Sequence, residues 1–86
     1  MKLTTSEVFN KVFKGNPNFI TPNFCGYYKG NGYFIELSEG NGMDNKPLYG
    51  VTVIKEKDNK YNQDYDKCDC FKSVENAQSY IDSLIK

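Results

Sequence analysis

The sequence predicts a small α+β domain, in which one helix comes first, three to four antiparallel strands follow and a second helix comes last. Three observations predict it. Amphipathic segments with helix-start signals lie near both ends, aromatic and β-branched residues fill the middle, and turn residues divide that middle. The 86 residues leave room for one hydrophobic core, so we expect a single domain over residues 1–86.

The first helix is expected at about residues 4–14. Thr4 is a good N-cap, and Glu7 three residues later completes a capping box. The apolar side chains that follow lie at helical spacing on one stripe, made of Val8, Phe9, Val12 and Phe13. The stretch Gly15–Pro17 is typical of a helix end.

Residues 24–39 are predicted to form a β-hairpin. Asn31 and Gly32 favour a type I′ turn, and with these two residues at its centre Tyr28 pairs with Ile35. Alternation of side chains then predicts one shared face that carries Phe24, Tyr28, Tyr33, Ile35 and Leu37.

The rest of the sheet is expected between residues 48 and 70, after a flexible loop from Gly40 to Pro47. The strand with the clearest signal runs from Leu48 to Lys57, because four consecutive residues within it are β-branched or have strong β-propensity. Its inward side chains are predicted to be Tyr49, Val51 and Val53. A turn at residues 58–60 leads into a weaker strand from Tyr61 to about Cys70.

The last helix is predicted to begin after Ser73, which is a good N-cap. Its apolar residues lie at helical spacing and give it one buried face, made of Val74, Ala77, Ile81, Leu84 and Ile85.

The composition excludes several classes of function. The chain has 11 lysines, 11 acidic residues and no histidine, arginine or tryptophan. Without histidine there is no Ser–His or Cys–His pair to activate a nucleophile, so we expect a protein that is not an enzyme. Without arginine and with zero net charge, sequence-specific binding to nucleic acid is not expected.

No apolar run reaches the roughly 20 residues that a membrane-spanning helix needs, so no membrane association is expected. The chain begins without an apolar stretch of signal-peptide length, and its odd number of cysteines makes a poor disulfide framework. We therefore expect a cytoplasmic protein, in the cytoplasm of the host cell if a phage encodes it.

The three cysteines carry the metal hypothesis. If the weaker strand is regular, Asp66, Cys68 and Cys70 share the face opposite Tyr61. Cys25 is likewise out of phase with the core positions of the hairpin, which places all three thiols on the less buried face of the sheet. Thiolates are preferred zinc ligands, so the pattern predicts a structural zinc held by Cys25, Cys68, Cys70 and Asp66.

The alternative is three unligated thiols, because a C-x-C pair with a remote third cysteine is not a standard zinc spacing. Strands in simple sequence order would place Cys25 about 14 Å from Cys68, too far for one metal ion. The zinc hypothesis therefore requires the last strand beside the first, irregular backbone near Cys68, or two chains that share the metal.

Three apolar residues, Tyr27, Phe34 and Ile54, are out of phase with the predicted core. They are candidates for a partner-binding surface of exposed aromatic and aliphatic side chains. The alternative is burial beneath the first helix, which must cover some part of the sheet.

The chain resembles the small phage-encoded anti-CRISPR inhibitors of type II-A systems. The resemblance lies in size, in Lys-, Asn- and Tyr-rich composition, in the single α+β domain and in the lack of catalytic residues; it covers the whole chain and involves no shared motif. It implies a host-protein partner, the Cas9 effector, and obstruction of DNA binding or cleavage. Many such inhibitors carry a strongly acidic face that mimics DNA, whereas this chain is neutral, so contact with a protein lobe outside the nucleic-acid channel is expected.

Two other classes remain open. One is a cytosolic protein-interaction module of a phage or bacterium without an inhibitory role. The other is a weak binder of single-stranded nucleic acid that uses the aromatic side chains of the sheet. For either class of partner, we expect a monomer or a homodimer.

Overall fold

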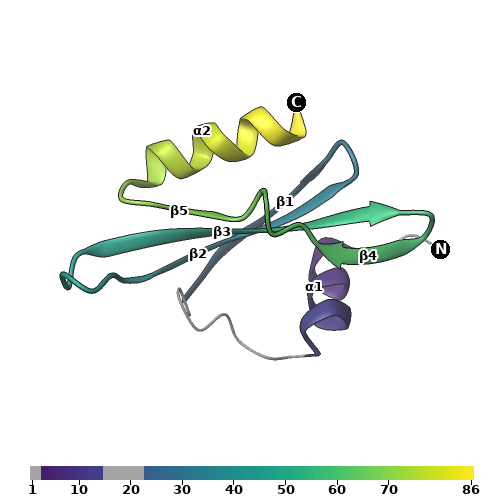
Figure 1. Ribbon diagram of the computed structural model, residues 1–86, viewed down its shortest axis with the longest axis horizontal. Coiled ribbons are helices and arrows are strands. Elements are labelled where there is room, and N and C mark those ends of the chain that lie inside the picture. The colour runs from purple at the N-terminus through teal and green to yellow at the C-terminus, as the bar shows by residue number, and fades with distance from the viewer. Residues whose placement is uncertain (1–2, 15–22) are drawn as a thin grey trace.

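The computed structural model describes residues 3–14 and 23–86, and it confirms the predicted α+β order of helix, antiparallel sheet and helix. The elements are α1 (Thr5–Phe13), β1 (Asn23–Gly30), β2 (Tyr33–Asn41), β3 (Pro47–Lys57), β4 (Lys60–Gln63), β5 (Asp69–Phe71) and α2 (Val74–Ile85). The strands follow the order β1-β2-β3-β4. β5 also pairs with β3, at residues 49–51, whereas β4 pairs with residues 54–57 of the same strand. In Figure 1, α2 lies over one face of this sheet and α1 lies against the other.

Local signals in the sequence set the ends of the helices. Thr4 and Glu7 form the predicted capping box at the start of α1, with Thr4 N–H donating to Glu7 Oε1 at 2.9 Å. Ser73 caps α2 by accepting a hydrogen bond from Asn76 N–H. Within residues 3–14 and 23–86, no helix has both the length and the apolar content needed to cross a membrane.

The hairpin registers follow from two-residue turns with positive φ. Asn31 has φ 52° and Gly32 has φ 80°, and Tyr28 faces Ile35 as predicted. The β3–β4 turn has the same character, with Asp58 at φ 53° and Asn59 at φ 63°.

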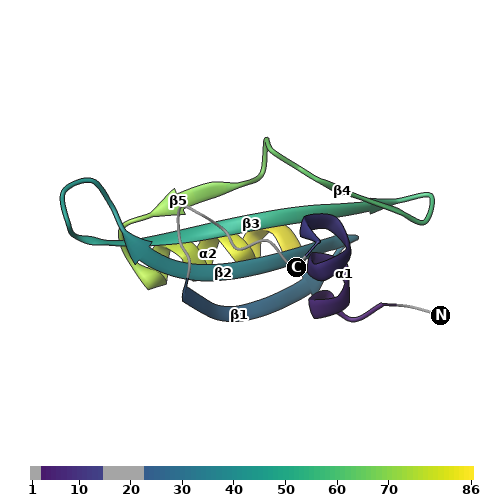
Figure 2. The same ribbon diagram turned by 90° about the horizontal axis from the view of Figure 1, so that it is seen from below.

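Two separate hydrophobic clusters lie on opposite faces of the sheet, and Figure 2 shows α1 crossing one end of the sheet while α2 lies behind it. The cluster under α2 contains the buried residues Ile35, Leu37, Val51, Val53, Ala77 and Ile81. The cluster under α1 contains the buried residues Val8, Phe9, Phe34 and Ile54. β2 and β3 therefore present apolar side chains on both faces of the sheet. For this reason consecutive residues of these strands are buried, and buried and exposed residues do not alternate regularly.

The prediction of one weaker strand from Tyr61 to Cys70 is wrong, because the chain makes a turn in the middle of it. Asp64 N–H donates to Val53 O, and the N–H groups of Lys67 and Cys68 then bond back to Asp64 O. The turn separates β4 from β5 and resets the alternation of side chains. Tyr61 packs in the α1 cluster, whereas Phe71 of β5 packs in the α2 cluster.

A second departure lies at the start of β1. The pairing with β2 shifts between Phe24 and Gly26, so that Cys25 is an extra residue in a β-bulge. The bulge moves Phe24 from the predicted α2 face to the α1 face, where its ring lies against Tyr27. In α2, Val74 is also more exposed than its position on the apolar stripe predicts.

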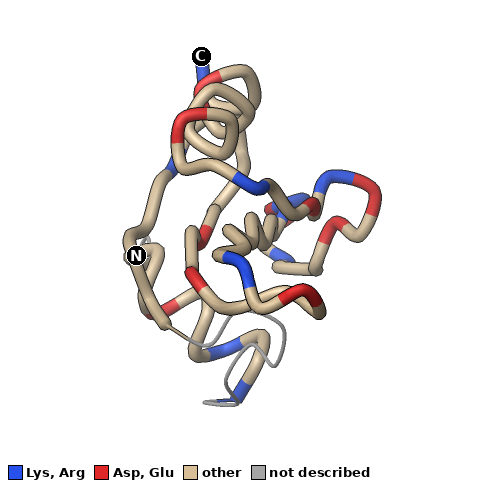
Figure 3. Tube along the Cα trace, turned by 90° about the vertical axis from the view of Figure 1, so that its left-hand side faces the viewer, with Lys and Arg blue, Asp and Glu red and all other residues tan. Residues whose placement is uncertain are grey.

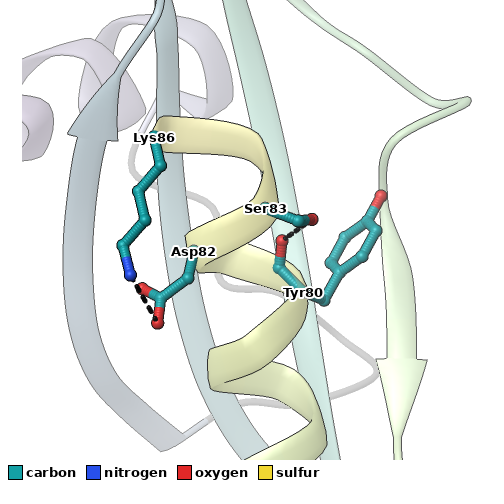
Figure 4. Close-up of polar contacts among 4 residues, drawn as sticks. All are labelled: Tyr80, Asp82, Ser83 and Lys86. Carbon is teal, nitrogen blue, oxygen red and sulfur yellow. Dashed lines mark hydrogen bonds and ion pairs between the residues drawn. The ribbon is translucent and has the colours of Figure 1, made fainter.

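Side-chain hydrogen bonds attach α2 to the sheet at several points along its length. Gln78 Nε2 donates to the hydroxyl of Tyr28, and the hydroxyl of Tyr80 donates to Lys67 O. Figure 4 shows Tyr80 projecting from the helix toward the segment that precedes β5. In the last turn Lys86 Nζ lies 3.8 Å from Asp82 Oδ2, in an exposed ion pair that contributes little to stability (Figure 4).

The C-terminal end of α2 is capped by the β1–β2 turn. Asn31 Nδ2 donates to Leu84 O at 3.0 Å and to Lys86 O at 2.9 Å, which satisfies two carbonyl groups that have no partner within the helix. Asn31 therefore has two roles. It adopts the left-handed backbone of the hairpin turn, and its side chain caps α2 at Leu84, 53 residues later in the sequence.

We expect Asn31→Gly to lower the free energy of unfolding by about 1 kcal/mol, because glycine keeps the left-handed backbone but loses both hydrogen bonds. Asn31→Asp should cost more, since a carboxylate would face carbonyl oxygens at the negative end of the helix dipole. Urea unfolding followed by circular dichroism measures both effects. Asn59→Gly is the control: its φ is also positive, at the β3–β4 turn, and equal losses in all three variants would contradict the capping role.

Candidate functional site

The four predicted zinc ligands do not come together within one chain. Cys25 lies in the bulge of β1 and Cys70 lies in β5, with β2 and β3 between them. Asp66 is exposed in the turn that separates β4 from β5. In the described ranges, 3–14 and 23–86, no group of three or more His, Cys, Asp or Glu side chains is placed to hold a metal ion. The strand order β1-β2-β3-β4 is thus the simple one, for which Cys25 is expected to lie too far from the other ligands to share one metal ion with them.

Cys68 instead lies against the edge of β3, where the pairing is interrupted. β4 pairs with β3 from Ile54 onward and β5 pairs with it up to Val51, so the edge between these points has no strand beside it. Val53 N–H donates to Cys68 Sγ at 3.3 Å, and the thiol lies 3.3 Å from Asp64 O, to which it donates. Because the thiol both accepts and donates, it replaces part of the missing strand ladder.

The other two thiols are exposed, and their surroundings favour the protonated form. Partial burial, followed by the nearby carboxylate of Glu39, raises the pKa of the Cys25 thiol. Partial burial also raises the pKa of Cys70, with smaller contributions from Asp69 and Cys68. The thiolate is the form that binds metal or attacks an electrophile, so neither environment activates its cysteine.

The structure separates the three candidate partner-binding residues. Phe34 is 5% exposed and Ile54 is fully buried, and both pack beneath α1 against Val8 and Phe9. Burial under the first helix, the second of the two alternatives, is therefore what the structure shows for this pair. Tyr27 remains 36% exposed at the surface of β1. An exposed patch made of all three residues is not present.

An exposed aromatic surface does occur on β1, and Phe24 and Tyr27 form it. We call this pair the β1 aromatic surface. Their ring centroids lie 4.5 Å apart, and Phe24 is 57% exposed. Tyr27 contacts Phe9 of α1 at 5.5 Å, and Phe9 contacts Phe13 at 5.7 Å, so the exposed rings rest on a row of packed rings. Tyr27 is consequently packed from the α1 side, and Phe24 rests against Tyr27.

Sequence reasoning missed Phe24 because it assumed an unbroken strand. One residue of bulge reverses the face of every residue beyond it. The available signal was Gly26, since glycine inside a predicted strand often marks a bulge.

Acidic and basic residues are mixed along the part of the chain that the structure describes, as Figure 3 shows. Two lysines lie over aromatic rings on the α1 side: Lys11 Nζ is 5.5 Å from the Tyr61 ring centroid and Lys29 Nζ is 5.5 Å from that of Phe34. These contacts cover ring faces with lysine side chains.

Glu36 is a half-buried residue of β2. It pairs with Tyr27 of β1 on one side and with Thr52 of β3 on the other. Burial raises its pKa above the usual 4.5. Because the folded state binds the proton more tightly than the unfolded chain, the stability gained from protonation is complete below pH 4.5 and is lost as the pH rises through the folded pKa.

We therefore expect Glu36→Gln to be more stable than the parent protein at pH 7, with the difference shrinking toward zero as the pH is lowered past 4.5. Thermal unfolding of both proteins between pH 3 and pH 8 measures it. Glu7→Gln is the control with opposite sign, because hydrogen bonds from Thr4 lower the pKa of Glu7. A constant difference across the pH range would contradict the assignment to burial of Glu36.

The arrangement offers exposed aromatic rings that pack on one another, and the surroundings of Cys25 and Cys70 do not activate their thiols. Aromatic side chains held in place by neighbours are typical anchors of protein–protein interfaces, since they bury a large area at a small cost in side-chain entropy. No protein-family model, curated protein or solved structure matches this chain.

Proposed function

We propose that this protein is a non-enzymatic protein-binding module that contacts a host protein through the β1 aromatic surface. The observation that carries the proposal is the exposure of Phe24 against Tyr27, with Phe9 and Phe13 packed behind them. Exposed aromatic area is unfavourable in water, and burying it against a partner recovers that free energy. The rings need little reordering to bind, because the packing behind them already fixes Tyr27.

The chemistry of the chain supports a role without catalysis. It has no histidine, and the pKa values of the Cys25 and Cys70 thiols are raised, which leaves both mainly protonated at neutral pH. The third thiol is occupied by hydrogen bonds with backbone atoms of Val53 and Asp64.

The specific form of the proposal is an inhibitor of Cas9. Its support is the resemblance to type II-A anti-CRISPR proteins in size, composition and domain organisation. The zero net charge and the mixing of acidic and basic residues along the chain favour contact with a protein lobe over competition for the nucleic-acid channel.

The test uses a purified type II-A Cas9 loaded with guide RNA. Biolayer interferometry measures binding, and cleavage of a labelled DNA target measures inhibition. The unmodified protein should bind and inhibit, and the double variant Phe24→Ser/Tyr27→Ser should bind at least about tenfold more weakly. Tyr65→Ser is the matched control, since Tyr65 is 77% exposed in the turn after β4 and lies outside the β1 aromatic surface.

Two outcomes would contradict the proposal at different levels. If the unmodified protein neither binds Cas9 nor slows cleavage, the inhibitor assignment fails. If it binds and the Phe24→Ser/Tyr27→Ser variant binds equally well, the β1 aromatic surface is not the contact. Comparison of proteins captured from host lysate by the parent and the double variant then tests the broader protein-binding role.

A further inference from the structure

The two helices are attached to the sheet in different ways. α2 is held by side-chain hydrogen bonds from Asn31, Gln78 and Tyr80, in addition to its apolar contacts. Among the described residues, the contacts given between α1 and the strands are apolar and aromatic, together with Lys11 over the Tyr61 ring. The capping box of α1 joins residues of its own first turn and adds nothing to this attachment.

The cluster under α2 is complete without α1. None of its six buried residues belongs to α1, and the two clusters share no member. α1 has nine residues and buries two side chains, Val8 and Phe9. A helix this short is marginal by itself and depends on the surface that it covers. Its detachment would therefore leave the sheet and α2 with their own core intact.

Beneath α1 lies an apolar surface of the sheet, which we call the α1 seat. It consists of Tyr27, Phe34, Ile54 and Tyr61. Phe34 and Ile54 are buried while α1 is in place, and Tyr27 joins the seat to the β1 aromatic surface. Opening of α1 would extend the exposed apolar area directly from that surface.

We propose that α1 is a displaceable cover, and that the α1 seat accepts an amphipathic helix of a partner protein in its place. The occupant is defined by what the seat already binds. α1 presents apolar side chains at two consecutive positions, Val8 and Phe9, and again four residues later, with Lys11 over the ring of Tyr61. A partner helix of the same pattern makes the same contacts. The inference extends the proposed protein-binding role and does not depend on Cas9 as the target.

Hydrogen exchange of the full chain tests whether α1 opens by itself. In dilute urea, amides of α1 should exchange at least about tenfold faster than those of β3 and α2, with a weaker dependence on urea, because the opening exposes less surface. Equal exchange rates and equal urea dependence in α1 and β3 would overturn the proposal, since α1 would then open only with the whole domain.

A variant of the full chain tests the seat. Val8→Asp/Phe9→Asp breaks the apolar face of α1, and a fluorescent peptide of residues 3–14 is then added as the probe. We expect β3 and α2 to keep their exchange protection, and the variant to bind the peptide saturably. The same peptide carrying both substitutions is the control and should not bind. Global unfolding of the variant, or no binding of the unmodified peptide, would overturn the proposal.

Discussion

Gly30→Ala is expected to lower the free energy of unfolding by about 1–3 kcal/mol, toward the upper end of that range. A methyl group at Gly30 would lie 2.6 Å from Ile85 O and 2.7 Å from Ile85 Cβ. The first contact is with backbone at the end of α2, so no change of side-chain rotamer relieves it. The helix end and the hairpin must move apart instead.

The displacement reaches the neighbouring cap. Asn31 follows Gly30 directly, and its two hydrogen bonds to Leu84 O and Lys86 O require the helix end to stay close to the turn. Loss of these bonds adds to the steric cost, and the melting temperature should fall by roughly 10 °C. Thermal and urea unfolding measure both quantities.

Gly26→Ala is the matched control, because Gly26 is a glycine of the same strand with ordinary space around it. The nearest atoms to a methyl group there belong to the Tyr28 ring, at 3.6 Å. We expect a change within about 0.5 kcal/mol. Equal destabilisation by the two substitutions would show that the close approach to α2 is not what requires glycine at position 30.

Features with local physical causes were predictable from the sequence. The capping box of Thr4 and Glu7, the N-cap Ser73 and the Asn31–Gly32 turn depend on residues a few positions apart, and all are present. The inward set of β3 was also predicted correctly, because alternation holds wherever a strand is regular.

Features that depend on distant backbone were not predictable. The alternating pattern after Tyr61 is compatible with a strand, and the turn that interrupts it begins at Asp64, whose N–H donates to the distant Val53 O. The bulge at Cys25 similarly depends on how β1 pairs with β2. The turn places Cys68 against the α2 cluster, and the bulge makes Cys25 an extra residue in β1, so the regular alternation behind the predicted ligand set does not hold at these two positions.

The candidate site was predicted in part for the same reason. That Phe34 and Ile54 are out of phase with the main core was correct, but periodicity does not say whether a helix or solvent faces them. The position of α1 decides this, and it is a property of tertiary packing. The role of Cys68 carries no sequence signal, because its hydrogen-bond partners in β3 are backbone groups.

Cys68→Ala is expected to lower the free energy of unfolding by about 1–3 kcal/mol, because Val53 N–H loses its acceptor at the edge of β3. The thiol also packs against the α2 cluster, so its removal leaves a small gap there. Cys68→Ser should lower the free energy of unfolding by less, since a hydroxyl still accepts a hydrogen bond. Some loss should remain, because the oxygen reaches less far than sulfur. Urea unfolding of the two variants measures the order.

Cys70→Ser and Cys25→Ser are the controls, because both thiols are exposed. Each should change the free energy of unfolding by no more than about 0.5 kcal/mol. Losses of similar size at positions 68 and 70 would contradict a role confined to Cys68.

The same set of variants separates hydrogen bonding at the β3 edge from a structural metal. Zinc ligands are required together, so a zinc site predicts similar losses for Cys68→Ser and Cys70→Ser and a lower melting temperature after treatment with a chelator. If Cys68 instead completes the β3 edge, Cys68→Ser should lose more unfolding free energy than Cys70→Ser, because the partners of Cys68 are Val53 and Asp64. The chelator should then leave the melting temperature unchanged. If the chelator destabilises the protein and metal analysis finds zinc, a site that includes both Cys25 and Cys70 is expected to be shared by two chains, since β2 and β3 separate these residues within one chain.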